Sequence, residues 1–321
     1  MPLSPSWRWN CERIYSARRA DQKGRTILVT GANSGIGFEA AKVLAEKCAR
    51  VLLGCRDEVR GRWAAKRIER AHSHAKVEWL PLDLSDLASV REAAKRLRKL
   101  DVLVNNAGIM RPPLGHAKDG FELQFGINHL GHFALTGLLL EKLGGPDPRV
   151  VTVSSIAHRR GRIDFANLDG KAGYQRSKFY TQSKLANLMF TLELDRRLRA
   201  GGSPVKSIGC HPGIAGTGLG RHGRIDALIE PAGNLLFNSS ERGALPTLQA
   251  ATDPSAQGGD YFGPKHLMEM RGDSAPGRIA SRARNEDVAR RLWDVSVELT
   301  GVDPGLAAAY PAKAPAFNWS M

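Results

Sequence analysis

The chain has 321 residues, of which 42% are hydrophobic and 25% are charged, a composition that excludes intrinsic disorder for most of its length. Its 47 Lys and Arg residues outnumber its 32 Asp and Glu residues, which gives a formal net charge of +15. The basic residues interleave with apolar ones at helical spacing and no nucleic-acid-binding motif accompanies them, so we expect solvated helix faces and no nucleic-acid partner.

Residues 1–22 differ in composition from the rest of the chain and are expected to be an N-terminal extension. Trp7, Cys11, Ile14 and Tyr15 share one face of a short predicted helix, which we expect to pack against the domain. The extension lacks the apolar core of a secretory signal, and no later stretch reaches the ~18 apolar residues of a membrane span. We therefore expect a soluble, cytoplasmic protein, while organelle targeting by the extension and peripheral contact with a membrane stay open.

From Lys23 onward, short β-rich runs alternate with amphipathic helices. Strands are predicted at 26–30, 50–55, 77–80, 101–105, 149–154 and 205–209. Helices are predicted at 38–47, 58–71, from Ser85 or Asp86 onward, 121–143 and 180–198. Apolar strands that alternate with helices form a parallel sheet covered on both faces. We therefore predict an α/β fold, a single doubly wound Rossmann-like domain over residues 23–300 with a C-terminal tail over 301–321.

A glycine-rich turn joins the first predicted strand to the first predicted helix. In this position Gly31 permits a tight turn, Gly35 lets the backbone approach a pyrophosphate, and Gly37 lets the helix pack close to the sheet. The free N–H groups at the start of the helix would face the phosphates. The turn therefore predicts a dinucleotide site formed by Gly31, Asn33, Ser34, Gly35, Ile36 and Gly37.

This turn opens a series of motifs that resembles the short-chain dehydrogenase/reductase superfamily over about residues 23–265. The series continues with Asp83-Leu84, Asn105-Asn106-Ala107-Gly108, Asn128, Ser154-Ser155, Tyr180-x3-Lys184 and Pro212-Gly213. The resemblance implies an oxidoreductase that moves a hydride between a nicotinamide cofactor and a substrate, with a tyrosine as general acid/base. It also implies cofactor contacts from Asp83, Leu84, Asn106, Ala107, Gly108, Tyr180, Lys184, Pro212, Gly213 and Thr217.

The end of the second predicted strand distinguishes the two nicotinamide cofactors. An acidic residue there would hold the ribose 2′-hydroxyl of NAD, whereas an Arg accommodates the 2′-phosphate of NADP. This chain has the uncharged Cys55 followed by Arg56, whose guanidinium matches the geometry of a phosphate. Asp57 would favour NAD if it turned inward, but we expect it to cap the next helix. The sequence therefore predicts NADP(H) as the cofactor, with NAD(H) as the alternative.

Two Tyr-x3-Lys pairs occur almost end to end, and residues four apart share one face of a helix. Only the pair of Tyr180 and Lys184 begins a convincing amphipathic helix. Tyr174, of the pair with Lys178, is expected in a glycine-containing loop. A phenol has a pKa near 10, and we expect the ammonium of Lys184 to lower the pKa of Tyr180 toward the working range. We therefore assign Tyr180 as the acid/base.

The family pattern supplies two further catalytic residues. It places the catalytic serine second in Ser-Ser, which implies Ser155 as the hydroxyl that binds the substrate oxygen and leaves Ser154 as its rival. It implies Asn128 as the proton-relay residue, although a buried Asn that satisfies backbone groups is an alternative. Lys184 would also hold the nicotinamide ribose, as it does in the family.

Ser155 and Tyr180 are 25 residues apart, a long spacing for the superfamily. The inserted residues 162–169, together with 128–133, His211-Pro212-Gly213 and 259–262, resemble the retinol-dehydrogenase-like branch, which acts on lipophilic alcohols and carbonyls. Two other readings stay open: a double-bond reductase of the protochlorophyllide-reductase kind, and a catalytically silent nucleotide-sensing protein. Residues 214–244, expected to cover the substrate, do not identify it, and the chain could be a monomer or a homo-oligomer.

Histidine and cysteine spacing does not indicate a metal. His129 and His132 lie three residues apart on a predicted helix, but no further ligands converge on them. The four cysteines show neither CxxC spacing nor histidine partners, which predicts free thiols in a reducing compartment. We therefore expect no metal site.

Overall fold

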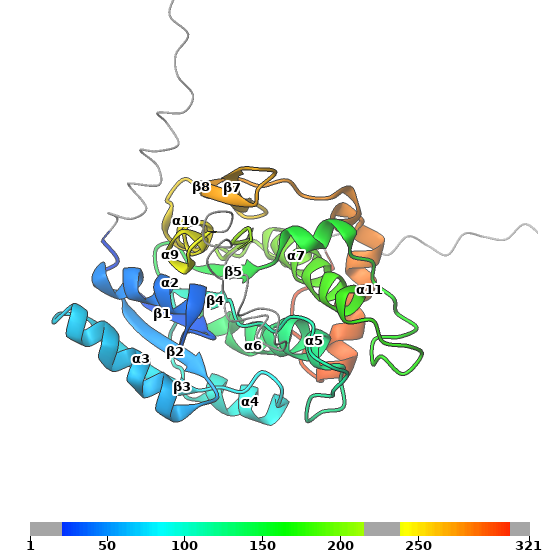
Figure 1. The fold of residues 1–321 in the computed structure, drawn as a ribbon, viewed down its shortest axis with the longest axis horizontal. Helices are drawn as coiled ribbons and strands as arrows, with labels where there is room; N and C mark the ends of the chain where they lie inside the picture. Colours follow the sequence, from blue (N-terminus) through cyan, green and yellow to red (C-terminus); the bar gives the residue numbers. More distant parts are fainter. Residues whose placement is uncertain (1–20, 215–237, 309–321) are drawn as a thin grey trace, which may run out of the picture.

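The computed structural model describes residues 21–214 and 238–308, which form one α/β domain around an eight-stranded sheet (Figure 1). The strand order is β3-β2-β1-β4-β5-β6-β7-β8. The strands are β1 (Thr26–Thr30), β2 (Arg50–Cys55), β3 (Lys76–Pro81), β4 (Val102–Asn105), β5 (Arg149–Val153), β6 (Lys206–Cys210), β7 (Tyr261–His266) and β8 (Arg271–Pro276). All neighbours pair in parallel except β7 and β8, which are antiparallel. The predicted doubly wound fold is confirmed.

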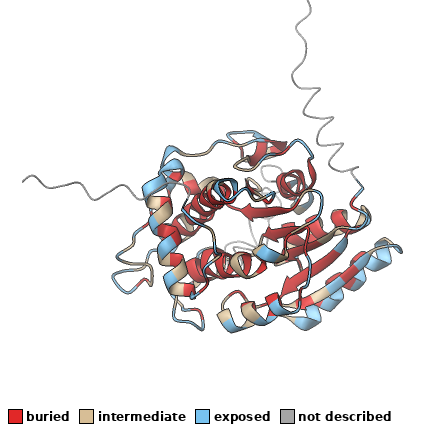
Figure 2. Ribbon diagram, turned by 180° about the vertical axis from the view of Figure 1, so that it is seen from behind, coloured by how far each residue is buried: buried red, intermediate tan, exposed pale blue. Residues whose placement is uncertain are grey.

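Helices cover both faces of the sheet. They are α2 (Gly35–Glu46), α3 (Glu58–Ala71), α4 (Leu87–Lys95), α5 (Leu123–Phe125), α6 (Gly131–Leu139), α7 (Arg176–Ala200), α9 (Ser240–Gly243), α10 (Leu245–Thr252) and α11 (Glu286–Thr300). Neighbouring residues of a strand point to opposite faces, so Ile27 and Val29 pack with α2, α3 and α10, while Leu28 packs with α4, α6, α7 and α11. Because both faces are covered, the inner strands are buried along almost their whole length (Figure 2).

Most predicted boundaries lie within two residues of the observed ones, but three regions differ. Helix α2 begins at Gly35 and α7 at Arg176, earlier than expected. The predicted helix 121–143 is α5, a π-helical turn over Gly126–Leu130 (η1), α6 and a 3-10 turn. At its centre Gly131 lies against Leu84, whose carbonyl oxygen is 2.5 Å from where a Cβ on this glycine would stand. Contact with a neighbouring loop therefore accompanies the change of helix type.

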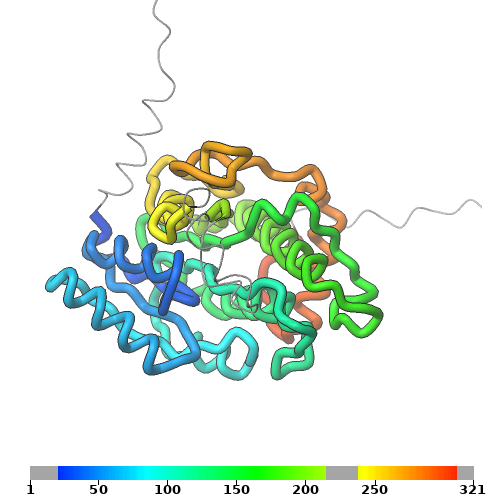
Figure 3. Tube along the Cα trace, in the orientation of Figure 1, coloured from blue at the N-terminus to red at the C-terminus, as the bar shows by residue number. Residues whose placement is uncertain are grey.

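The strands β7 and β8 were not predicted. The sequence of β8, Arg-Gly-Asp-Ser-Ala-Pro, contains no β-branched or aromatic residue and ends in Pro, so it carries no strand signal. It forms because it pairs with β7 at the edge of the sheet. Helix α11 likewise lies against α7, far from it in sequence (Figure 3).

Several expectations concern the ends of the chain. The helix predicted around Trp7 and Cys11 falls outside the described residues, whereas Val302 of the expected C-terminal tail packs in the core beside α6. Within residues 21–214 and 238–308, no helix has the length and apolar character needed to cross a bilayer. The same residues contain no cluster of three or more His, Cys, Asp or Glu side chains suited to a metal ion.

Candidate active site

The glycine turn after β1 packs directly against the segment that follows β4. Gly31 has φ +64°, and a Cβ on it would lie 2.9 Å from the Cα of Ala107. A Cβ on Gly37 would overlap the side-chain amide of Asn106. The structure therefore brings together two of the predicted cofactor segments, and it does so through contacts that only glycine permits.

The start of α2 is open to an anion. Ser34 is the N-cap residue, is exposed and makes no side-chain capping hydrogen bond, and the first helical turn contains no acidic residue. The first N–H groups of the helix and the positive end of its dipole are therefore not neutralised by a side chain. Asn33 and Gly35 lie at the same turn, and Ile36 is buried beneath it. This arrangement fits a phosphate.

The residues at the end of β2 have separate roles. Asp57 caps α3 by accepting a hydrogen bond from the backbone N–H of Arg60 at 2.9 Å, as predicted. Cys55 is buried, and burial raises the pKa of its thiol to about 11. Arg56 is exposed and forms no hydrogen bond or ion pair with any described residue. Gly54 pairs with Thr30, so the segment that carries Arg56 lies beside the glycine turn.

Asp83 is engaged locally. Its Oδ1 accepts hydrogen bonds from the backbone N–H and the hydroxyl of Ser85, at 2.9 and 2.6 Å. Leu84 is buried against α6, and Asp86, one of the two residues predicted to open α4, is its N-cap. The structure places Asp83 at the carboxyl edge of the sheet, where it closes a turn.

Thr30 joins the glycine turn to the Asn105–Gly108 segment. Its hydroxyl accepts hydrogen bonds from the backbone N–H groups of Asn106 and Ala107, both at 2.9 Å, and the Asn106 side chain donates to the Thr30 carbonyl at 2.8 Å. Asn105 instead turns toward α6, where it donates to Thr136. Thr30 thus fixes the backbone after β4.

Lys184 lies deep in the site, on α7. Its Nζ donates to the carbonyl of Val153 at 3.2 Å and lies 6.0 Å from the centre of the Tyr180 ring. Burial lowers the pKa of Lys184 to about 8. A Cβ on Gly108 would lie 3.4 Å from this Nζ and 3.2 Å from Oδ1 of Asn128. The structure therefore brings Gly108, Asn128 and Lys184 together.

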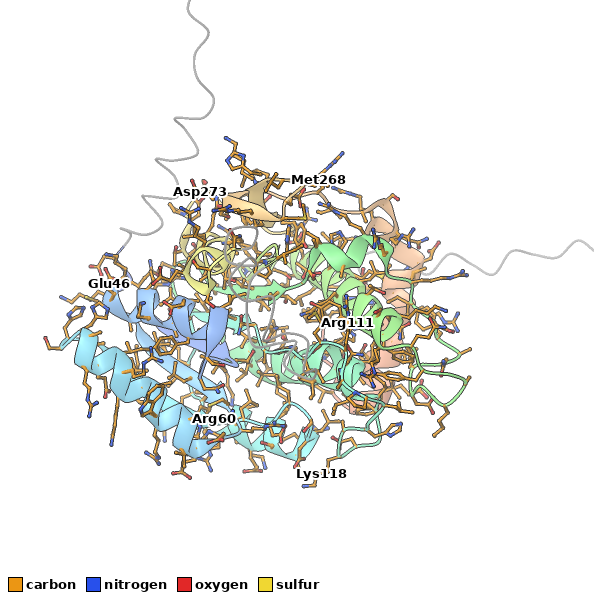
Figure 4. All side chains as sticks on the ribbon, in the orientation of Figure 1. Glu46, Arg60, Arg111, Lys118, Met268 and Asp273 are labelled. Carbon is orange, nitrogen blue, oxygen red and sulfur yellow. The ribbon has the colours of Figure 1, made fainter. Side chains whose placement is uncertain are left out.

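Two groups that were not expected to tune the Tyr180 hydroxyl act on its pKa. Burial raises the pKa of Tyr180, while a hydrogen bond with Ser155 and the positive charge of Arg111 act in the opposite direction. The expectation that Lys184 lowers this pKa is therefore wrong for the protein alone. Arg111 lies between α5 and α7 (Figure 4), where its backbone N–H donates to Gln124 at 2.9 Å.

The two serines differ in their contacts. Ser154 is buried and donates its hydroxyl to the carbonyl of Lys184 at 2.7 Å, which fixes α7. Ser155 accepts from the N–H of Ala157 at 3.2 Å and faces Tyr180. Its own carbonyl lies 2.6 Å from Nδ1 of His158, a contact that no sequence pattern indicated.

Tyr174 lies in the loop before α7, as predicted. Its hydroxyl donates to the carbonyl of Pro112 at 3.0 Å and accepts from Gln124 at 2.9 Å. Burial and the neighbouring carboxylate of Glu122 raise the pKa of Tyr174 to about 12. The Tyr174 hydroxyl is therefore occupied in linking its own loop to Pro112 and to Gln124 of α5.

Asn128 uses its entire side-chain amide. Oδ1 accepts from the N–H of Ile109 at 2.8 Å, and Nδ2 donates to the carbonyl of Ile109 at 3.0 Å and to the hydroxyl of Ser183 at 2.9 Å. These contacts match the alternative of a buried Asn that satisfies backbone groups, while the proton-relay role stays a prediction. The amide satisfies neighbouring groups, so a role in proton transfer would fall to the main-chain carbonyl.

Pro212 and Gly213 lie where β6 meets the turn between β7 and β8. Gly213 has φ +75°, and a Cβ on it would overlap the carbonyl of Met270. Next to it, buried His211 contacts Glu269 at 3.0 Å, and Glu269 pairs with Arg159 at 2.6 Å. Thr217, the remaining predicted cofactor contact, lies outside the described residues.

Known proteins resemble this chain in sequence and fold. Residues 25–228 match the family model of the short chain dehydrogenases. Retinol dehydrogenase 11 of Homo sapiens is 43% identical over 286 residues, which cover 87% of this chain and 86% of that protein. The crystal structure of an uncharacterized protein from Mycobacterium Paratuberculosis has a TM-score of 0.76 at 41% identity, covering 88% of this chain and 96% of that one. A short chain dehydrogenase from Burkholderia cenocepacia J2315, solved in complex with NADP, shares the fold with a TM-score of 0.59 at 22% identity, covering 75% and 96%.

Proposed function

This chain belongs to the short-chain dehydrogenase family, and we propose that it interconverts a lipophilic alcohol with its aldehyde or ketone and prefers NADP(H) to NAD(H). As a member of that family it is an oxidoreductase of CH–OH groups that works with a nicotinamide cofactor. The observation that carries the proposal is that Ser155, Tyr180 and Lys184 lie together beside Gly108. This group adjoins the glycine turn, and the helix α2 that follows the turn has no side-chain cap.

The cofactor preference follows from Arg56. The N–H groups at the start of α2 would hold the pyrophosphate, and the exposed guanidinium of Arg56 would hold a 2′-phosphate. Asp57, the residue that could favour NAD, is occupied in capping α3. When bound, the nicotinamide supplies or accepts the hydride.

The proton is handled by groups of the chain itself. In the reducing direction the hydroxyl of Tyr180 donates its proton to the carbonyl oxygen of the substrate, and in the oxidising direction the phenolate accepts it from the alcohol. The hydroxyl of Ser155 hydrogen-bonds the same oxygen and holds it next to Tyr180. The positive charge of Arg111 and the hydrogen bond with Ser155 oppose the burial that raises the pKa of Tyr180, and Lys184 would hold the nicotinamide ribose.

The proposal of a lipophilic substrate is based on similarity to relatives of known name. Several relatives at about 40% identity are named retinol dehydrogenases, and retinol is a primary alcohol on a long apolar chain. We propose that this chain takes substrates of the same chemical kind.

The test is a panel of apolar alcohols, aldehydes and ketones, assayed with NADP(H) and NAD(H) by absorbance at 340 nm, with Tyr180→Phe as the inactive reference. We expect turnover of an apolar aldehyde–alcohol pair, faster with NADP(H) at limiting cofactor. Turnover of conjugated double bonds alone would overturn the proposal in favour of a double-bond reductase. Tight NADPH binding without turnover of any of these classes would favour a nucleotide-sensing protein.

A further inference from the structure

His132 lies between the glycine turn and the catalytic groups. It is 1% exposed, on the first turn of α6. Its Nδ1 is 3.0 Å from the main-chain carbonyl of Asn128, and its Nε2 is 2.9 Å from the hydroxyl of Thr30. One side chain thus contacts both halves of the candidate site.

The contacts of Thr30 determine which ring nitrogen carries the proton. The Thr30 hydroxyl oxygen accepts from the N–H groups of Asn106 and Ala107, which uses both of its lone pairs. The hydroxyl can then only donate its single proton. The carbonyl of Val104 is 3.4 Å away, beyond the usual range for an O–H···O bond, whereas Nε2 of His132 is at 2.9 Å. Nε2 is therefore the acceptor, and Nδ1–H donates to the carbonyl of Asn128.

The surroundings of the ring keep it neutral. Burial and the positive charge of Lys184 on α7 lower the pKa of His132 to about 4, against a favourable hydrogen bond from its Nδ1 to Asn128. The neighbouring His129 on η1 is also fully buried, and its pKa is lowered to about 3. A neutral ring is what the arrangement requires, because a protonated Nε2 could no longer accept from Thr30.

The carbonyl that His132 holds is the part of Asn128 left for chemistry. The Asn128 amide is committed to Ile109 and Ser183. The bond from Nδ1–H of His132 fixes the direction of this carbonyl. Asn128 also lies in the π-helical turn, a helix irregularity that often occurs at functional sites.

We propose that His132 is a positioning residue that aligns the carbonyl of Asn128 for proton transfer and, through Thr30, the Asn106–Ala107 backbone that packs on the cofactor turn. It couples the two halves of the site without touching substrate. This inference rests on the proposed function, because it takes Asn128 and the glycine turn as parts of the working site.

Two substitutions separate the two ends of the ring. The amide nitrogen of Asn can take the place of Nδ1, so His132→Asn retains the donor to Asn128 and loses the acceptor for Thr30. The amide oxygen of Gln can take the place of Nε2, so His132→Gln retains the acceptor and loses the donor. We measure the Kd of NADPH by fluorescence titration, kcat at saturating cofactor, and the Tm of the cofactor-free protein.

We expect His132→Asn to weaken NADPH binding by about tenfold with kcat within about threefold of wild type. We expect His132→Gln to lower kcat by about tenfold or more with the Kd of NADPH within about twofold. A purely structural histidine would instead lower Tm and change Kd and kcat together in both variants, and that outcome overturns the proposal. So do two variants that behave like wild type.

A measurement on the folded wild type covers the case in which neither variant folds. In ¹⁵N-histidine NMR, the Nε2 signal of His132 is the one that shifts in Thr30→Val and not in Thr30→Ser. We expect that signal to have the value of a hydrogen-bond acceptor, and an Nε2–H signal would overturn the proposal. Tyr180→Phe distinguishes a failure of the proposed function from a failure of this inference. Full activity of this variant refutes the proposed function, whereas an inactive Tyr180→Phe with an unaffected His132→Gln refutes this inference alone.

Discussion

The exposed guanidinium of Arg56 leads to the first prediction at the scale of single residues. Arg56→Ala should weaken NADPH by about 1.5–3 kcal/mol, the range for hydrogen bonds to charged groups, and leave NADH unchanged. Isothermal titration with both cofactors measures this difference. Lys66→Ala is the matched control, because Lys66 is an exposed basic residue on the neighbouring α3. Equal losses for the two cofactors would contradict the assignment of Arg56.

The contacts of the two tyrosines separate their roles. Tyr180→Phe should lower kcat by ~10²-fold or more, because it removes the proton donor to the substrate oxygen. Tyr174→Phe should keep kcat within a few-fold, since its hydroxyl serves Pro112 and Gln124, although thermal stability should fall. Steady-state kinetics and thermal melting of both variants measure this contrast. An essential Tyr174 would show that the acid/base has been assigned to the wrong pair.

Arg111 gives a prediction about pH. Its positive charge opposes the burial that raises the pKa of Tyr180, so Arg111→Ala should raise that pKa further. Alcohol oxidation needs the phenolate, so the rise of its rate with pH should move to higher pH in this variant. Reduction needs the protonated phenol and should stay favoured at lower pH. Arg111→Lys retains the charge and should restore the wild-type profile of oxidation. An unmoved profile in Arg111→Ala would show that this charge does not act on the acid/base.

At the scale of elements, the packing of the glycine turn against the Asn106–Ala107 backbone is the most restrictive feature. Gly37→Ala should destabilise the protein by ~1–3 kcal/mol, because the new methyl group overlaps the Asn106 amide and the Gly31 carbonyl. NADPH binding should weaken as well. Gly144→Ala is the control, since a Cβ there meets no atom within 4 Å. Thermal melting and NADPH titration compare the two variants, and equal melting temperatures would contradict the close packing.

The elements that sequence patterns predicted are those whose own residues carry the signal. β1, β2, β4 and β5 are rich in Val, Leu and Ile, and α3 and α4 begin at Asp N-caps. The interruption of the helix over 121–143 is not indicated by the local sequence, because apolar residues recur along the whole stretch at helical spacing and favour a continuous helix. The π-helical turn lies next to Gly131, which packs against Leu84 on a different segment.

At the scale of the whole molecule, buried neutral histidines should make stability depend on pH. Burial lowers the pKa of His129 to about 3 and those of His132 and His158 to about 4, below the ordinary value of 6.5. Below pH 6.5 the unfolded chain binds protons that the folded protein excludes, so stability falls as pH decreases from 6.5 toward 4. Each histidine contributes on the order of 2 kcal/mol of this loss by pH 5.

Thermal melting between pH 7.5 and 5 measures this loss. His129→Gln should flatten the decrease in Tm, because it removes one group that must stay neutral in the fold. His74→Gln is the control, since His74 is exposed on the surface. If His129→Gln loses stability with acid as steeply as wild type and His74→Gln do, the buried histidines are not the cause of the loss.

By itself the sequence determined the doubly wound fold, the glycine turn and the family, because each depends on residue types that follow one another at short range. It also determined that Asp57 caps α3. Only the tertiary structure decided what surrounds the candidate acid/base. Arg111 opposes the rise of its pKa, His158 holds the carbonyl of Ser155, and His132 joins Thr30 to Asn128. These contacts link segments far apart or follow from burial, and neither hydrogen-bond direction nor desolvation can be deduced from spacing along the chain.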